Sequence, residues 1–539
     1  MANAHGCPIH LYIACNALAD KDTFSKSDPF AVLYAKPAQG APQGGLRKIG
    51  RTEMIKDCLN PTFKTHMAVS FLFETKQEFV LKVFDDDGER NDESNESLGV
   101  AEFQLSHIMT ARGRTKTLPL GIGAGTVTIS GVEVGGASRG TVQLFLRGSK
   151  LKKMDTFGQS DPFFTVNRIL PTKALKELYK SEVVKNTLTP TFRGTSLMKI
   201  DELTGANQDE PCIEFQFFDE DLMSNDSMGG FKVSFSDLVR AEKDKTPFIM
   251  KKADKPDKFY GEIYVEKIVM VAPPTFASML QDGWQISLAV SIDFTGSNGN
   301  PRQPTSLHYM DPRQPNQYVR AIMSVGEILM EYDTDKQVPV FGFGASIAGR
   351  TEHFFHVNQQ PNPYVSGVQG ILDVYGRFLP NAMLSGPTNF APTIKSATAG
   401  ARQTENDKCY TVLLIITDGE ITDMDKTINE IVAADDAPLS IVIVGVGNGC
   451  DFTAMDQLDG DGGFLRGYSR TSRRDIVQFV PFRTFANSGS EMLAAEVLRE
   501  IPRQVEDFAQ LKNIKVVNNV GQPPQAQQQP QQPPAAPVV

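Results

Sequence analysis

The chain has 539 residues, of which 40% are hydrophobic and 22% are charged, and its formal net charge is −10. This length and composition predict a globular protein of three or four domains. The negative charge argues against a nucleic-acid-binding protein, because phosphate recognition needs a basic surface. The six cysteines form no Cys-x-x-Cys pair, which predicts reduced thiols in a cytosolic protein.

The start of the chain predicts neither export nor lipidation. It has no basic segment followed by a long apolar run, and position 2 is alanine, whereas N-myristoylation requires glycine there. The longest apolar run, around residues 412–416, is far shorter than the ~20 residues of a membrane-spanning helix. We therefore expect a soluble, cytoplasmic protein.

Residues 1 to about 270 contain many short strands with alternating apolar and polar positions, separated by Gly, Pro, Asn and Asp. This pattern predicts β-sandwiches. Three landmarks recur in the same order at a period of about 133 residues, which indicates a duplicated domain. They are Asp-x5-Asp-Pro-Phe (22–30 and 155–163), a Pro-Thr-Phe turn (61–63 and 190–192) and a Phe followed by three acids (84–87 and 218–221).

The pattern changes after the two prolines at 273–274. Continuous apolar runs at 286–292, 338–341, 410–416 and 439–446 alternate with helical stretches such as 318–332, which predicts a parallel α/β sheet. The last residues are mostly Gln, Pro and Ala and predict a disordered tail. We expect one sandwich at 1–130, a second at 131–272, the α/β domain at 280–515 and the tail at 516–539.

The repeated acids predict calcium sites. Calcium takes six to eight oxygen ligands, and the strand period places Asp85 and Asp87 on one side with Asp86 on the other. An EF-hand is excluded, because Gly88 as the sixth loop position would make Val83 the first. The spacing resembles that of C2 domains, in which two loops share calcium ions. This resemblance implies Asp22, Asp28, Asp85 and Asp87 as ligands in the first cup, and Asp155, Asp161, Asp219, Asp221 and Asp226 in the second.

The fifth ligand of the first cup is less regular. Glu96 lies three residues before Gly99, as Asp226 lies three before Gly229, and Asp92 is also nearby. Bound calcium would cancel the charge of each cup, so that anionic lipid headgroups complete the coordination. Apolar residues at the expected loop tips suit insertion into a bilayer, although a tip folded back on its own loop is an alternative. These residues are Phe24, Phe157, Leu222 and Met223.

The α/β domain has a second kind of metal motif. Asp293, Thr295 and Ser297 follow an apolar strand, and ligands of open α/β sheets bind at the carboxyl ends of strands. Their oxygens suit Mg²⁺ or Mn²⁺. The motif resembles the metal-ion-dependent adhesion site of von Willebrand factor A domains, with Thr295 in place of a serine. That resemblance implies Thr388 and Asp418 as the remaining ligands, and a carboxylate of a partner protein in the open position.

The order of domains resembles the copine family over residues 1 to about 515. The resemblance is carried by residues 293–301, 341–345, 386–392 and 479–483. It implies a non-enzymatic cytosolic protein that moves in response to calcium to the plasma membrane or endomembranes and recruits intracellular target proteins. One alternative is a magnesium-dependent phosphoryl-transfer protein, but no Walker A loop is present. The other is a ubiquitin-ligase-like protein, but the chain lacks a Cys/His zinc series.

Overall fold

The computed structural model describes residues 6–515 except 23–24, 38–44, 90, 135–139, 155–157, 171, 205–208, 222–224, 253, 272, 420, 450, 460–462 and 487. The chain folds into two compact units. One joins Met1–Val134 to Pro274–Val539, and the other consists of Gly135–Pro273.

The first sandwich packs two antiparallel four-stranded sheets, with the orders β4-β1-β8-β7 and β3-β2-β5-β6. Residues 9, 11 and 13 of β1 are buried and their neighbours are less so, as the period of two requires. The short helix α1 (Leu105–Met109) follows β6. The strands are β1 (Cys7–Asn16), β2 (Pro29–Ala35), β3 (Arg47–Arg51), β4 (Met67–Phe71), β5 (Glu78–Asp85), β6 (Ser97–Gln104), β7 (Thr115–Pro119) and β8 (Thr126–Glu133).

The second sandwich repeats this arrangement around a core of its own. Its sheet β11-β10-β13-β14 corresponds to β3-β2-β5-β6, and β12-β9-β16-β15 faces it. The duplication predicted from the sequence is thus confirmed. The elements are β9 (Thr141–Ser149), β10 (Pro162–Ile169), β11 (Leu175–Lys180), β12 (Met198–Lys199), α2 (Ile200–Thr204), β13 (Ile213–Asp219), β14 (Asp226–Val233), α3 (Phe235–Asp244), β15 (Phe248–Ile249) and β16 (Glu262–Val271).

The α/β domain is built on a sheet of order β21-β18-β17-β23-β24-β25. Neighbours from β18 to β25 are parallel, as predicted. The short strands β21 and β22 instead pair antiparallel with β18, because the chain returns to β18 without a helical crossover. The strands are β17 (Gln285–Asp293), β18 (Gln337–Phe343), β19 (Ala345–Ile347), β20 (Arg350–Glu352), β21 (Phe355–His356), β22 (Tyr364–Ser366), β23 (Cys409–Thr417), β24 (Leu439–Gly445) and β25 (Val477–Pro481).

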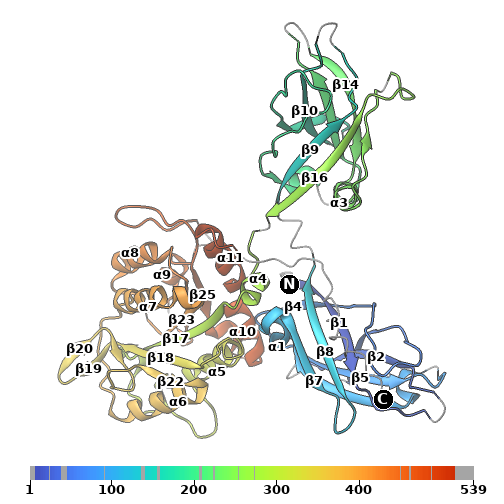
Figure 1. Ribbon diagram of the computed structural model, residues 1–539. Coiled ribbons are helices and arrows are strands. Elements are labelled where there is room, and N and C mark those ends of the chain that lie inside the picture. The colour runs from blue at the N-terminus through green and yellow to red at the C-terminus, as the bar shows by residue number, and fades with distance from the viewer. Residues whose placement is uncertain are drawn as a thin grey trace, which may run out of the picture. The chain divides into compact units, whose positions relative to one another are not determined.

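Helices cover both faces of this sheet (Figure 1). Leu413 and Ile415 of β23 pack in the cluster that contains residues of α7, α8 and α9, whereas Val412 and Leu414 pack with α5, α6, α10 and α11. Burial on both faces explains why β23 is a continuous apolar run. The helices are α4 (Phe276–Gln281), α5 (Gln317–Leu329), α6 (Gly367–Phe378), α7 (Ala391–Gln403), α8 (Met424–Ala434), α9 (Thr453–Asp456), α10 (Ser490–Leu498) and α11 (Ile501–Leu511).

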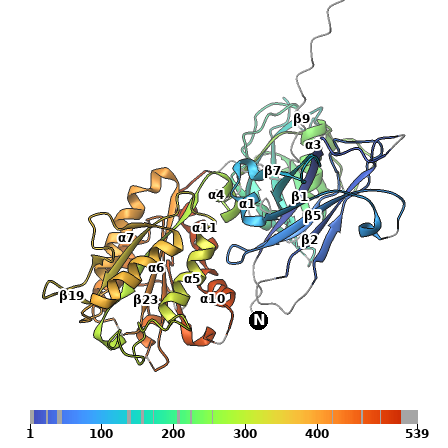
Figure 2. The same cartoon turned by 90° about the horizontal axis from the view of Figure 1, so that it is seen from below.

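Within the larger unit, the first sandwich and the α/β domain share one hydrophobic cluster. The Phe73 ring lies with its centroid 4.6 Å from that of Tyr332 and 4.9 Å from that of Phe276. The Tyr332 hydroxyl donates to the Phe73 carbonyl over 3.3 Å, and His107 Nε2 lies 2.8 Å from Glu331 Oε2. Helix α1 lies beside α4 in both views (Figures 1 and 2). These contacts join the two domains within one compact unit.

Candidate metal centres

Each sandwich holds a buried aspartate at the end of its central strand. In the first, the Asp28 backbone N–H donates to Asp85 Oδ1 over 2.6 Å. In the second, the Asp161 N–H donates to Asp219 Oδ1 over 2.5 Å. Oδ2 of both aspartates is buried, and no hydrogen-bond donor of the described residues reaches it. A buried carboxylate oxygen without a partner is unfavourable. Both oxygens therefore fit a cation.

The aspartates of the first loop are also fixed by matching contacts. Asp28 Oδ1 accepts from the Asp57 backbone N–H over 2.7 Å, and Asp161 Oδ1 accepts from that of Asn186 over 2.6 Å. Lys185 Nζ lies 3.0 Å from Asp161 Oδ2. The Asn186 N–H, together with Lys185, holds the pKa of Asp161 below its usual range. Asp161 is therefore ionised and able to bind a cation at neutral pH.

The middle acid of each triplet lies near a basic side chain. Asp86 Oδ2 lies 3.4 Å from Arg51 Nη2, and Glu220 Oε2 lies 2.6 Å from Lys185 Nζ. The outer acids, Asp87 and Asp221, are solvent-exposed. Exposed carboxylates next to a buried one form a cup that is open to solvent.

The backbone places Glu96 in the first sandwich where Asp226 stands in the second. The Asp85 N–H donates to the Glu96 carbonyl, while Asp219 is paired with Asp226 in the strand register. In both sandwiches the strand register shifts just before the buried aspartate, between Val83 and Phe84 in the first and between Phe217 and Phe218 in the second. Gly99 and Gly229 have positive φ, and a Cβ there would lie 2.6 Å and 2.8 Å from a carbonyl oxygen. Only glycine fits both positions.

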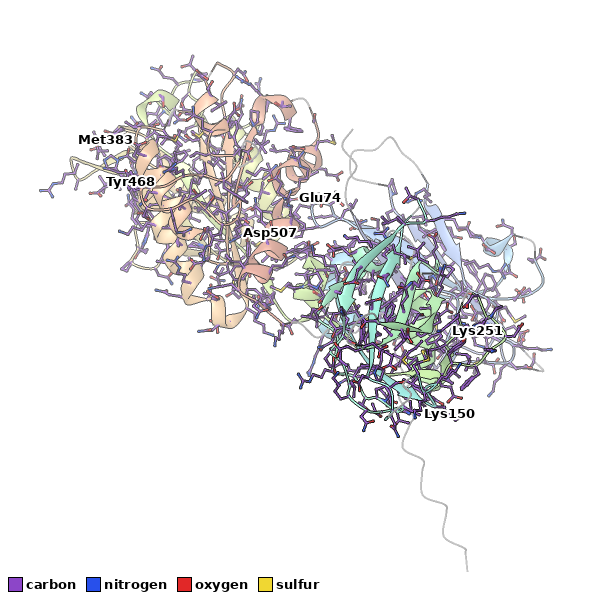
Figure 3. All side chains as sticks on the ribbon, turned by 90° about the horizontal axis from the view of Figure 1, so that it is seen from above. Glu74, Lys150, Lys251, Met383, Tyr468 and Asp507 are labelled. Atoms are coloured by element: carbon purple, nitrogen blue, oxygen red, sulfur yellow. The ribbon has the colours of Figure 1, made fainter. Side chains whose placement is uncertain are left out.

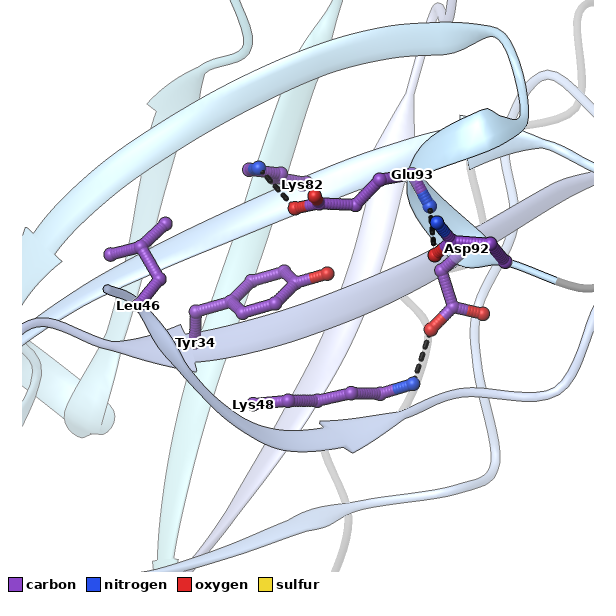
Figure 4. A pocket seen from close by; sticks show the side chains of 7 residues that line it. Tyr34, Leu46, Lys48, Lys82, Asp92 and Glu93 are labelled. Carbon is purple, nitrogen blue, oxygen red and sulfur yellow. Dashed lines mark hydrogen bonds and ion pairs between the residues drawn. The ribbon is translucent and has the colours of Figure 1, made fainter. Parts of the chain in front are cut away.

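Asp92, the alternative to Glu96, is buried and held by ion pairs. It belongs to the turn η1 (Asp92–Ser94), forms an ion pair with Lys48, and lies 3.0 Å from Arg51 Nη1. With Tyr34, Lys82 and Glu93 it lines a pocket of about 510 Å³ (Figure 4). These ion pairs hold its carboxylate away from the cup. The Glu96 carboxylate is more exposed and lies 3.2 Å from Lys21 Nζ.

The remaining predicted residues of the cups lie partly outside the described part of the chain. Asp22 is exposed and its Oδ2 accepts from Ser25 Oγ over 2.8 Å, and Asp226 is also exposed. The residues outside the described part are Asp155 and the four apolar tip residues Phe24, Phe157, Leu222 and Met223.

The α/β domain gathers its predicted metal-binding residues at one edge of the sheet. Strand β17 ends at Asp293, and its parallel neighbour β23 ends at Thr417, directly before Asp418. Because parallel strands end at the same edge, the two acids meet there. Ser297 Oγ donates to Asp418 Oδ1 over 2.9 Å and lies 2.9 Å from Thr295 Oγ1. Sequence motifs more than one hundred residues apart thus form one site.

Thr388 approaches the same site from the loop before α7. A Cβ added to Gly419 would lie 3.3 Å from Thr388 Oγ1 and 3.7 Å from Ser297 Oγ. The two hydroxyl groups therefore flank the same space. Ser297 is solvent-exposed, whereas Asp293 and Thr388 are buried, so the site opens to solvent on the side of Ser297.

Two buried carboxylates make this site electronegative. Among the described residues, no lysine or arginine forms an ion pair with Asp293 or Asp418. Burial, together with the charge of Asp293, raises the pKa of Asp418 to about 7, and burial raises the pKa of Asp293. Two carboxylates and three hydroxyls form a hard oxygen donor set, which fits Mg²⁺ or Mn²⁺.

Sequence reasoning missed contacts around the site. Thr417 Oγ1 donates to Asp293 Oδ2 over 2.5 Å, and Asn298 Nδ2 donates to Asp418 Oδ1 over 2.8 Å. Both residues stand directly next to residues that the motifs assign as metal ligands, and this adjacency is the one signal in the sequence that could have identified them. Elsewhere, carboxylate oxygens of Asp459, Asp475 and Glu500 lie within 4.8 Å of one another. No spacing in the sequence indicates that group.

No helix in the described part of the chain combines the length and the apolar character needed to cross a bilayer.

Comparisons with known proteins agree with this organisation. C2 domains match residues 11–120 and 142–250, and the Copine family matches residues 306–517. Copine-A of Dictyostelium discoideum is 39% identical over 514 residues, which cover 93% of this chain and 84% of that protein.

Solved structures of similar folds include calcium-bound C2A and C2B domains of Extended-Synaptotagmin 2, with 16% identity, covering 49% of this chain and 96% of that chain with a TM-score of 0.20. The manganese-loaded TRAP protein of Plasmodium vivax has 14% identity, covering 38% of this chain and 71% of that chain with a TM-score of 0.24. The family assignment depends on the sequence comparisons. With two C2 domains followed by a Copine domain, and with 39% identity to Copine-A over most of both chains, this protein belongs to the copine family.

Proposed function

We propose that this protein binds calcium in its two C2 domains and associates with anionic phospholipid membranes as a result. We further propose that it recruits target proteins through a metal ion in its α/β domain, which is called the A domain below. The observation that carries the proposal is the pair of orphaned oxygens, Oδ2 of Asp85 and Oδ2 of Asp219. Because the chain has a net charge of −10, bound cations are needed to reverse the local sign before an anionic surface can bind.

The proposed calcium ligands of the first cup are Asp22, Asp28, Asp85, Asp87 and Glu96. Those of the second are Asp155, Asp161, Asp219, Asp221 and Asp226. The equivalent backbone contacts of Glu96 and Asp226 support assigning Glu96 over Asp92. The four apolar tip residues are proposed to insert into the bilayer. The protein would thus be cytoplasmic, with peripheral membrane association when calcium rises.

Liposome sedimentation tests the membrane proposal. We expect the full-length protein to pellet with vesicles of mixed phosphatidylserine and phosphatidylcholine in calcium, and to stay in the supernatant with chelator. Vesicles of phosphatidylcholine alone are the control for charge. Equal pelleting with calcium and with chelator would refute the proposal.

In the A domain, the proposed ligands of Mg²⁺ or Mn²⁺ are Asp293, Thr295, Ser297, Thr388 and Asp418. A carboxylate of the partner would complete the coordination on the exposed side of Ser297. Met383 precedes the segment that contacts Thr295 through Ser385, and its side chain is 66% exposed (Figure 3). An exposed apolar side chain close to a metal site is suited to contact with a protein partner.

We propose that the A domain is not catalytic. His308 is the imidazole closest in sequence to the motif, but it is buried and bonded to Tyr375 and to the Asp293 carbonyl, and burial lowers its pKa to about 3. It therefore stays neutral and faces the core, not solvent. A pull-down from cytosol with the full-length protein and its Asp293→Ala variant tests recruitment: capture should require metal and Asp293. Metal-dependent nucleotide turnover that Asp293→Ala abolishes would show an enzyme instead.

A further inference from the structure

We propose that Asn298 and Tyr318 are positioning residues of the A-domain metal site, which orient Asp418 so that only one of its oxygens faces the metal. This inference rests on the proposed function, since it assumes that the A domain binds Mg²⁺ or Mn²⁺. It concerns two residues that contact no substrate or partner, because both are buried beneath the site.

Asn298 is 1% exposed and all of its amide contacts are made inside the domain. Its Nδ2 donates to Asp418 Oδ1 over 2.8 Å and to the Thr295 carbonyl over 3.3 Å. Its Oδ1 accepts from the Tyr318 hydroxyl over 2.7 Å. A carboxylate and a carbonyl oxygen can only accept here, so the amide nitrogen of Asn298 faces Asp418 and Thr295, and its oxygen faces the Tyr318 hydroxyl.

Asp418 Oδ1 receives a second hydrogen bond from Ser297 Oγ over 2.9 Å. Both side-chain hydrogen bonds that Asp418 accepts from the described residues thus go to Oδ1, and none goes to Oδ2. Hydrogen bonds to one oxygen of a ligating carboxylate hold it in a single orientation and strengthen metal binding. Asn298 would therefore leave Oδ2 available to a bound metal ion.

Tyr318 is itself held in place from the other side. Its ring stacks on His308 with a centroid distance of 4.3 Å. His308 Nε2 lies 2.9 Å from the carbonyl oxygen of Asp293, and its Nδ1 lies 2.8 Å from the Tyr375 hydroxyl. This buried layer connects the backbone of one acid of the site to the side chain of the other. It gives Asn298 a rigid support beneath the metal site.

The test is a Mn²⁺ binding isotherm of the full-length protein, recorded by electron paramagnetic resonance of free Mn²⁺. The isotherm of Asp293→Ala supplies the background from the C2 domains. We expect Asn298→Ala to weaken A-domain binding by about 10–100-fold, as for other residues that support metal ligands. Tyr318→Phe keeps the ring and removes only the hydroxyl, and we expect a loss of roughly threefold to tenfold.

Tyr410→Phe is the matched control. Tyr410 is also fully buried, and it lies at the start of β23, the opposite end of the strand from Asp418. Its hydroxyl bonds to Leu439 and Ser440, so its loss should lower stability without changing Mn²⁺ affinity. Wild-type affinity in both Asn298→Ala and Tyr318→Phe would overturn this inference alone. An isotherm of the wild type that matches Asp293→Ala would overturn the proposed A-domain function and, with it, this inference.

Discussion

The two C2 domains hold their central aspartates in the same way but differ in the loop that follows. In both, a backbone N–H occupies one oxygen of the buried acid and leaves the other without a donor. Eight residues then separate Asp87 from Glu96, whereas four separate Asp221 from Asp226. The extra residues of the first loop form η1, whose Asp92 pairs with Lys48 and Arg51. The repeat therefore preserves the cup while the longer loop adds a separate network of ion pairs.

The two domains also differ in their surroundings. The first shares a hydrophobic cluster with the A domain through Phe73, Phe276 and Tyr332. The second forms a unit with its own core. Two copies of one fold therefore stand in different surroundings: the first shares its core with a neighbouring domain, and the second is covered by its own core.

The first prediction, which has the largest expected effect, compares the loss of charge in the calcium cups of the two C2 domains. Asp219→Asn with Asp221→Asn should weaken calcium-dependent membrane binding more than Asp85→Asn with Asp87→Asn. Each lost charged contact is worth ~1.5–3 kcal/mol, or roughly 10–100-fold in affinity. A lysine pairs with one proposed ligand in each cup, Lys21 with Glu96 and Lys185 with Asp161. The second cup has five aspartates at the regular spacing, whereas the fifth position of the first cup is a glutamate. Liposome sedimentation over a calcium titration measures the difference, and the reverse order would show that the longer loop contributes more.

The second prediction concerns the shared core. Phe73→Ala should destabilise the larger unit by about 3–5 kcal/mol, because it removes a buried ring that contacts both domains. Phe192→Ala, in the core of the second C2 domain, is the matched control. Scanning calorimetry should show that Phe73→Ala lowers the unfolding temperature of the A domain and that Phe192→Ala leaves it unchanged. If Phe73→Ala left the unfolding temperature of the A domain unchanged, the two domains would not share a hydrophobic core.

The third prediction uses pH to separate the A domain from the cups. Since the pKa of Asp418 is about 7, Mg²⁺ binding should weaken about tenfold per pH unit below that value, whereas Asp161, with its lowered pKa, stays ionised. Without metal, the raised pKa of Asp418 has the opposite effect: the folded domain becomes less stable as the pH rises. Its contribution is present below pH ~4 and is lost as pH rises to about 7. Thermal denaturation with magnesium and with chelator should be measured from pH 5.5 to 8. The increase in unfolding temperature that magnesium causes should grow with pH, and an increase that is constant over this range would exclude this role of Asp418.

The smallest effect distinguishes Glu96 from Asp92 in the first cup. Glu96→Gln should lower calcium affinity several-fold, since an exposed ligand contributes ~1 kcal/mol or less. Asp92→Asn should leave calcium binding unchanged, because the Asp92 carboxylate is engaged by Lys48 and Arg51. Calcium isotherms of the two variants in an Asp219→Asn background check this. A loss confined to Asp92→Asn would reassign the fifth ligand.

Much of the fold followed from the sequence because strong patterns have few structural solutions. The apolar run at 410–416 lies within β23, and the helical spacing at 318–332 lies mostly within α5. The antiparallel strands β21 and β22 did not follow, since two or three residues carry no periodic signal.

The candidate sites were predictable where repeat or motif spacing marked the residues. The equivalence of Glu96 and Asp226 needed the strand register, because loop length hides it in the sequence. Asn298 needed the packing of the domain, since its contact with Asp418 joins residues 120 positions apart. Contacts between distant segments depend on tertiary structure, which local patterns do not specify.

The most direct test of the central claim is calcium binding without lipid by the variant that carries both Asp85→Asn and Asp219→Asn. These two substitutions leave the backbone hydrogen bonds in place and remove the charge that the orphaned oxygens share. Isothermal titration calorimetry of the wild type should show calcium binding, and the double variant should show almost none. Binding by the double variant with the wild-type affinity and stoichiometry would contradict the account.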